Sequence, residues 1–246
     1  MKSNNPAFNA ETFRQYETDF AAPRGLTMTV QGAVSKTFLL LAILSGAAIW
    51  SWTQASEGKM SQGLLMGSAL GGFVVAMVTI FRPNLASWTA PVYAALEGVF
   101  LGALSMFIET HYYKGIAMQA VALTSCTLFV MLVLYGTRTI RVTDKLRTGI
   151  IAATGALCLA YMIMMVLNLC GMHVAFPRGG LGIGISLFIV GLAAFNLLLD
   201  FDMIERGAAS GAPKSMEWYG AFGLIVTLVW LYLEILRLLR MLSDRR

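Results

Sequence analysis

The chain has 246 residues, of which 57% are hydrophobic and 13% are charged, and its mean hydropathy is +0.70. This composition lies outside the range of soluble domains and indicates an integral membrane protein. The net charge of +5 comes largely from short basic segments such as TRTIRVTDKLR, which suit anionic lipid headgroups. We therefore expect the lipid bilayer as a partner, and no nucleic acid.

Apolar runs of membrane-spanning length occur seven times, near residues 36–56, 63–81, 88–108, 115–135, 149–171, 181–203 and 218–241. A helix needs about 20 residues to cross roughly 30 Å of hydrocarbon. The runs lack the alternating pattern of an outer-membrane barrel, so they predict an all-α integral membrane protein, a seven-transmembrane-helix bundle. We expect a cytoplasmic N-terminal tail, residues 1–35, without a signal peptide, and a single membrane domain, residues 36–246.

The distribution of Lys and Arg predicts the orientation, because cytoplasmic loops retain positive charge. With the N-terminus in the cytoplasm, the inner segments hold eleven such residues: Lys2, Arg14, Arg24, Lys36, Arg82, Arg138, Arg141, Lys145, Arg147, Arg206 and Lys214. The outer loops hold three: Lys59, Lys114 and Arg178. Seven spans then place the C-terminus and its four arginines outside. A sixth or seventh segment that re-enters the membrane is the alternative, and it would return the C-terminus to the cytoplasm.

Several membrane enzymes are disfavoured by missing residues. The sequence has no HExxH motif and no P-loop, and its two histidines, His111 and His173, lie at the ends of apolar runs. An intramembrane aspartyl protease also places one acid on each of two neighbouring helices, but the Gly-x-Gly-Asp pattern is missing here. We therefore expect a protein that is not an enzyme and holds no permanent cofactor.

Small residues give two expectations about packing. Glycines at every fourth position of the second and third runs predict faces where helices approach closely: Gly63, Gly67 and Gly71, then Gly98 and Gly102. All three cysteines fall in apolar runs without CxxC spacing, which predicts buried, reduced thiols: Cys126, Cys158 and Cys170.

Carboxylates inside the apolar runs are the strongest functional signal. Asp200, followed by Asp202, lies in the sixth run, Glu234 lies in the seventh, and Glu97 lies in the third. An ionised Asp near the middle of a spanning helix costs about 2.5–3.5 kcal/mol, so such acids indicate a polar cavity, a proton relay or an ion path. For Glu97, a structural hydrogen bond and a role in the ion path are both open. Glu234 has a local candidate partner in Arg237, three residues further on.

At these residues the chain resembles the Bax-inhibitor family, also called the transmembrane Bax-inhibitor-motif family, in its bacterial YccA-like branch. The carriers are LLLDFDMIE in the sixth run and WLYLEILRLL in the seventh. The resemblance implies a bacterial inner membrane and a pH-sensing carboxylate pair, Asp200 and Glu234, that gates a calcium leak with Arg82 as basic partner. Glu stands at position 234 where the family more usually has Asp, and the segment between the acids is long.

Two carboxylates that share a site cannot both ionise cheaply, so such a pair would hold a proton at a pH where a free acid would not. When deprotonated, Asp200 and Glu234 would offer hard oxygen ligands to a transient calcium ion. Asp202 and Glu97 are further candidates for the ion path, and the Arg82 guanidinium would bridge the pair.

Helix geometry sets a condition on that pair. Glu234 is sixteen residues into the run that begins at Trp218, about 24 Å along the helix axis, whereas Asp200 lies near the inner end of its run. The two acids meet only if the last helix begins before the hydrocarbon.

The leading hypothesis is therefore a pH-sensitive calcium leak channel or cation pathway, with calcium and protons as partners. Two alternatives stay open at this point. One is a proton/calcium exchanger, and the other is a regulator that does not transport but binds other membrane proteins, such as a protease or a stress or cell-death partner.

Overall fold

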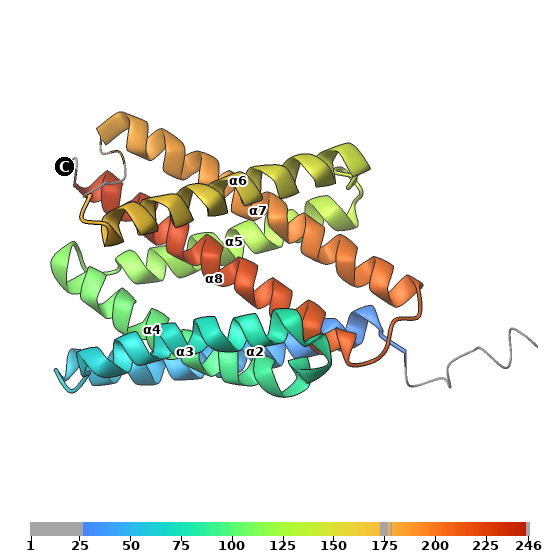
Figure 1. Cartoon of the computed structure of the whole chain (residues 1–246), viewed down its shortest axis with the longest axis horizontal. Helices are drawn as coiled ribbons and strands as arrows, with labels where there is room; N and C mark the ends of the chain where they lie inside the picture. The colour runs from blue at the N-terminus through green and yellow to red at the C-terminus, as the bar shows by residue number, and fades with distance from the viewer. Residues whose placement is uncertain (1–26, 173–176, 178, 245–246) are drawn as a thin grey trace, which may run out of the picture.

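The computed structural model describes residues 27–172, 177 and 179–244, and this part of the chain is a bundle of helices (Figure 1). Seven of them are long and apolar enough to cross a membrane, which confirms the predicted all-α membrane fold. In chain order the helices are α2 (Val30–Ser56), α3 (Gln62–Phe81), the short 3-10 helix η2 (Pro83–Leu85), α4 (Ala86–His111), α5 (Ile116–Gly136), α6 (Asp144–Leu169), α7 (Gly179–Ala209) and α8 (Met216–Ser243).

Several helices extend past the apolar runs, because a helix continues through polar residues once it leaves the hydrocarbon. The first helix begins at Val30, six residues before the predicted domain start at residue 36, and the Thr29 side chain caps it by accepting a hydrogen bond from the Gly32 N–H. The segment α7 continues to Ala209, where Gly211 with φ +69° allows the chain to turn. Most of the predicted N-terminal tail, residues 1–26, lies outside the described residues.

The last helix, α8, is the centre of the bundle. It packs against α7, α2, α5 and α4, and in Figure 1 it crosses between the α2–α4 group and the α5–α7 group. Fourteen of its residues are buried, against three in α2 and one in α6. The helices α3 and α6 pack on the outside, chiefly against α4 and α7 respectively. Several polar groups carried by α8 are therefore shielded from lipid and water, among them Glu217, Thr227 and Glu234.

The helices α2 and α4 approach each other closely, and two of the predicted glycines allow this contact. An added Cβ at Gly98 or Gly102 would collide with the backbone carbonyls of Leu44 and Ala48. In the second run the prediction is confirmed at Gly71, where an added Cβ would lie 3.4 Å from Leu96 of α4. It is wrong at Gly63 and Gly67, where an added Cβ would meet no other helix of the described residues within 4 Å. A glycine stripe thus marks a packing face only where another helix covers it.

The cysteine prediction is wrong in one respect. Cys126, Cys158 and Cys170 are free thiols, as expected, but all three are exposed on the surface of the bundle. In a membrane protein the outer face is as apolar as the core, because lipid covers it. An apolar run therefore does not tell which of its residues are buried.

The ends of the described chain lie at opposite ends of the bundle, as seven crossings require (Figure 1). The helix α8 runs without a break from Met216 to Ser243, about 42 Å at 1.5 Å per residue, so the structure has a full span where the alternative expected a re-entrant segment. Just before α2, Thr27 forms an antiparallel bridge with Pro213, and the Met28 N–H donates to the Ala212 carbonyl at 2.7 Å. The starts of α2 and α8 therefore share one end.

Candidate functional site

Asp200, the first predicted site residue, lies against α8. The Thr227 side chain hydrogen-bonds to its carboxylate, and its Oδ1 lies 3.9 Å from the position that a Cβ would take at Gly223. The other oxygen, Oδ2, is buried and has no hydrogen-bond partner among the described residues. Burying a carboxylate oxygen without a hydrogen-bond partner costs free energy, so a bound proton or cation would stabilise this group.

Glu234, the second predicted acid, is 2% exposed and has several partners. The Arg237 Nη1 donates to Oε1 at 3.2 Å and to Oε2 at 3.1 Å, so the local ion pair expected as one option is present. Tyr161 of α6 joins them: its hydroxyl accepts from Arg237 at 2.6 Å and donates to Glu234 at 3.2 Å. Trp230 also hydrogen-bonds to Glu234. The charge of this acid is compensated locally.

The structure does not bring the two acids together. Asp200 lies opposite Gly223 and Thr227, and Glu234 is seven residues beyond Thr227, about 10 Å further along the α8 axis. The predicted carboxylate pair is therefore not formed, and Asp200 and Glu234 lie at different depths in the bundle. The reason is the register of α8, which begins at Met216 and places Thr227, not Glu234, beside Asp200.

Both acids nevertheless lie along one line of polar side chains. Gly223, Thr227, Trp230 and Glu234 fall on one face of α8, because their spacings of four, three and four residues follow the helical period. On α7, Asn196 lies one turn before Asp200 and donates to the Thr154 hydroxyl of α6 at 2.8 Å. We call this line the α8 seam: Asp200, Asn196, Thr154, Thr227, Trp230, Tyr161, Glu234 and Arg237.

Asp202 does not point into the α8 seam but forms ion pairs at one end of α7. It pairs with Arg147, at the start of α6, and with Arg206, one turn further on α7, at 3.0 Å. In the same region, the Tyr135 hydroxyl of α5 donates to Glu205. These contacts tie α5, α6 and α7 together, and Asp202 therefore has two cations as partners.

The remaining predicted residues lie on the other side of the bundle. The Glu97 Oε1 lies 3.0 Å from the position of an added Cβ at Gly72, so this acid faces α3. Arg82 is the C-cap of α3 and is exposed, and among the described residues no hydrogen bond or ion pair joins it to Asp200 or Glu234. The helix that carries it packs chiefly on α4. Neither residue is brought to the α8 seam.

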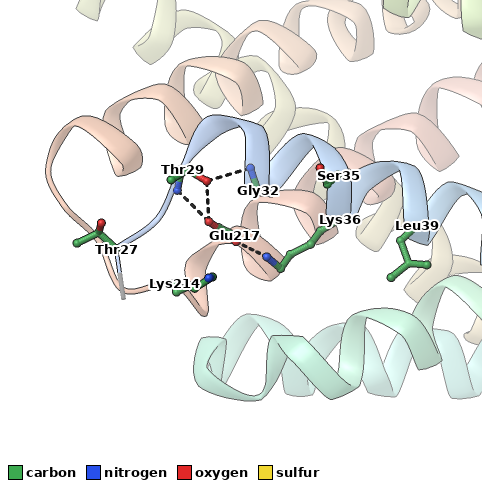
Figure 2. Close-up of a pocket in the computed structure, with 8 residues that line it drawn as sticks. All are labelled: Thr27, Thr29, Gly32, Ser35, Lys36, Leu39, Lys214 and Glu217. Atoms are coloured by element: carbon green, nitrogen blue, oxygen red, sulfur yellow. Dashed lines mark hydrogen bonds and ion pairs between the residues drawn. The ribbon is translucent and has the colours of Figure 1, made fainter. Parts of the chain in front are cut away.

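Another buried acid, Glu217, was not singled out by the sequence analysis. It is 1% exposed, and Figure 2 shows it between Thr29 and Lys36 of the first helix region. The Thr29 N–H and hydroxyl each donate to its Oε1 at 2.9 Å, and Lys36 forms an ion pair with its Oε2. Glu217 lies outside the predicted last run, next to Lys214, and its partners are more than 180 residues away in sequence, so no local pattern indicated this contact.

Within residues 27–172 and 179–244, no group of three or more His, Cys, Asp and Glu side chains converges as a metal site would. The acids of the α8 seam are single carboxylates, which suits brief passage of a cation better than permanent retention.

Comparison with known proteins agrees with the motifs in α7 and α8. A search among curated proteins gave no match. The family model described as Bax inhibitor 1 like matches residues 5–244, nearly the whole chain. This match confirms the resemblance read from LLLDFDMIE and WLYLEILRLL. The chain therefore belongs to the Bax inhibitor 1 like family.

Proposed function

We propose that the chain forms a proton-sensitive pathway for cations, with calcium as the leading candidate, along the α8 seam. The observation that carries this proposal is Asp200, a buried carboxylate with one oxygen that lacks a partner in the described chain. Ionisable groups inside membrane-spanning helices generally mark ion or proton pathways. The polar side chains that continue from Asp200 toward Glu234 give such a pathway a direction across the bundle.

In this proposal Asp200 is the group at which protons and calcium compete. Its ionised carboxylate offers oxygen ligands to a calcium ion, and Thr227 and Asn196 offer neutral oxygens nearby. A proton on Asp200 removes the negative charge and weakens calcium binding. We therefore expect calcium flux to fall as the pH falls.

Glu234 has a different part in the proposal. Its ion pair with Arg237 places a cation in the α8 seam, and Tyr161 holds that cation from the side of α6. A fixed positive charge opposes the passage of calcium. We propose that this cluster keeps the pathway closed at rest and that conduction requires Arg237 to move away from the α8 seam.

The decisive experiment measures calcium entry into proteoliposomes with an enclosed dye, between about pH 5 and 8, where protonation changes of perturbed carboxylates fall. The Asp200→Asn variant keeps the size of the side chain and its bond with Thr227, and it should lower the flux and remove its pH dependence. Asp144→Asn is the matched control, because this acid in the first turn of α6 is exposed and lies outside the α8 seam. Flux equal to that of empty vesicles at every pH would contradict the proposal and favour the regulator.

A proton/calcium exchanger is a second candidate, because the same open carboxylate of Asp200 would bind either ion. An exchanger differs from a leak in one measurable way: a pH gradient drives calcium against its own gradient. Vesicles with equal calcium on both sides and an imposed pH difference distinguish the two. Net accumulation that Asp200→Asn abolishes would identify an exchanger. No net accumulation by a protein that passes calcium down its gradient would identify a leak.

A further inference from the structure

A pocket of about 430 Å³ lies between the starts of α2 and α8, apart from the α8 seam. Its lining combines two lysines, one carboxylate, three hydroxyls and one leucine: Lys36, Lys214, Glu217, Thr27, Thr29, Ser35 and Leu39, with Gly32. Figure 2 shows the lysines coming from two different segments, Lys36 from α2 and Lys214 from the residues before α8. The fold thus brings together charges that are 178 residues apart in the chain.

The charges in the pocket do not cancel. Glu217 is the only acid in the lining, and three donors already occupy it: the N–H and the hydroxyl of Thr29 and the ammonium of Lys36. Lys36 keeps two further N–H donors, because an ammonium group has three. Lys214 is exposed and forms no ion pair with the described residues. The pocket therefore has one positive charge in excess and unused donors, which is the pattern that recognises an anion.

We place the pocket at the interface between headgroups and hydrocarbon, because it lies where the apolar run of α2 begins. It lies at the end of the bundle where both α2 and α8 begin. Leu39 is nine residues into α2, about 13 Å from Val30, and it is exposed together with its neighbour Phe38. The pocket is thus polar and basic toward the bundle end and apolar toward the membrane interior, and the exposed apolar face of α2 continues from it.

We propose that this pocket binds an anionic phospholipid. The phosphate group lies between Lys214 and the free N–H donors of Lys36, and an acyl chain follows Leu39 and Phe38 into the bilayer. Two observations favour a lipid over a soluble phosphate ester: the pocket lies at the start of the apolar run of α2, and its lining changes from the basic Lys36 and Lys214 to the apolar Leu39. Basic pockets between transmembrane helices are known binding places for such headgroups.

Native mass spectrometry of the full chain in detergent tests the proposal, with phosphatidylglycerol and phosphatidylcholine as probes. We expect a tightly bound phosphatidylglycerol and no comparable binding of phosphatidylcholine. Lys214→Gln should weaken the affinity for phosphatidylglycerol about fivefold, the loss expected for one lysine at a charged membrane surface. Lys214→Arg should keep it. Lys145→Gln is the matched control, because this lysine is exposed in the first turn of α6 at the same end of the bundle.

Three results would overturn the assignment. Equal affinity for the two lipids would show that the pocket does not select an anion. Equal losses in Lys214→Gln and Lys145→Gln would show diffuse attraction to the whole basic surface. Displacement of phosphatidylglycerol by millimolar inorganic phosphate would identify a site for soluble phosphates instead of lipids. Lys214 is exposed, so its substitution should leave the melting temperature unchanged, and a binding loss in Lys214→Gln then reports on the pocket.

Discussion

The ion pair between Lys36 and Glu217 predicts a strong energetic coupling between the first and the last helix. Glu217→Gln keeps the size of the side chain and an oxygen that can accept from Thr29. It removes the negative charge, however, and turns an amide group toward the Lys36 ammonium. The variant therefore leaves a partly buried cation without its counterion, which is the costly way to break such a pair.

Burial sets the size of the effect. Removing one partner of a fully buried ion pair costs about 3–5 kcal/mol. Glu217 is 1% exposed, but the side chain of Lys36 keeps 18% of its surface and can move toward lipid headgroups. We therefore expect Glu217→Gln to destabilise the protein by about 2–3 kcal/mol. The exposed ion pair of Lys59 with Glu57 is a matched comparison, with an expected contribution of roughly 0–1 kcal/mol.

A double-mutant cycle measures this coupling. The free energy of unfolding is determined in mixed micelles for Glu217→Gln, for Lys36→Met and for the double variant. If the pair acts as one unit, the double variant costs little more than either single variant, and the coupling energy is about 2 kcal/mol. A coupling energy below about 0.5 kcal/mol, the scatter between independent sites, would refute the reasoning.

Three further predictions concern Arg82, two of the glycines and the orientation of the C-terminus. Arg82→Gln should leave the pH midpoint and the resting rate of calcium flux unchanged, because Arg82 is exposed and joins neither acid; a shift of either would restore it to the site. Gly102→Ala should destabilise the protein by about 1–3 kcal/mol, because the new Cβ meets the Ala48 carbonyl, whereas Gly67→Ala in open space should be neutral or stabilising in thermal unfolding. A reporter fused after Arg246 should be active only outside the cytoplasm; cytoplasmic activity would contradict the predicted orientation.

The number of helices was predictable because the length of an apolar run follows directly from the thickness of the bilayer. Which face of each helix is buried was not, because lipid-facing and core-facing residues are equally apolar, as Cys126 and Gly67 illustrate. The sequence did not indicate Glu217 as a site residue, because its partner Lys36 is 181 residues away. Both residues also lie at the ends of apolar runs, where charged residues are common. The acids of α7 and α8 were found from their cost in a membrane, and the spacing of three residues indicated Arg237 as the partner of Glu234. The residues beside Asp200 could not be predicted, because they depend on the register of α8.

The last prediction is that Asp200 and Glu234, which the register of α8 keeps apart, affect calcium flux in different ways. Two unit charges about 10 Å apart interact by roughly 1.7 kcal/mol at an effective dielectric constant of 20, and the Arg237 cation beside Glu234 offsets most of this. The charge of Glu234 therefore has little influence on protonation at Asp200. Glu234→Gln should change the resting rate of calcium flux, because it loosens Arg237, while the pH midpoint stays within a few tenths of a unit of the wild type. Asp200→Asn should instead remove the pH dependence. If both variants abolish it equally in the proteoliposome assay, the acids share a proton after all, and α8 must shift along its axis by about two turns to bring them together.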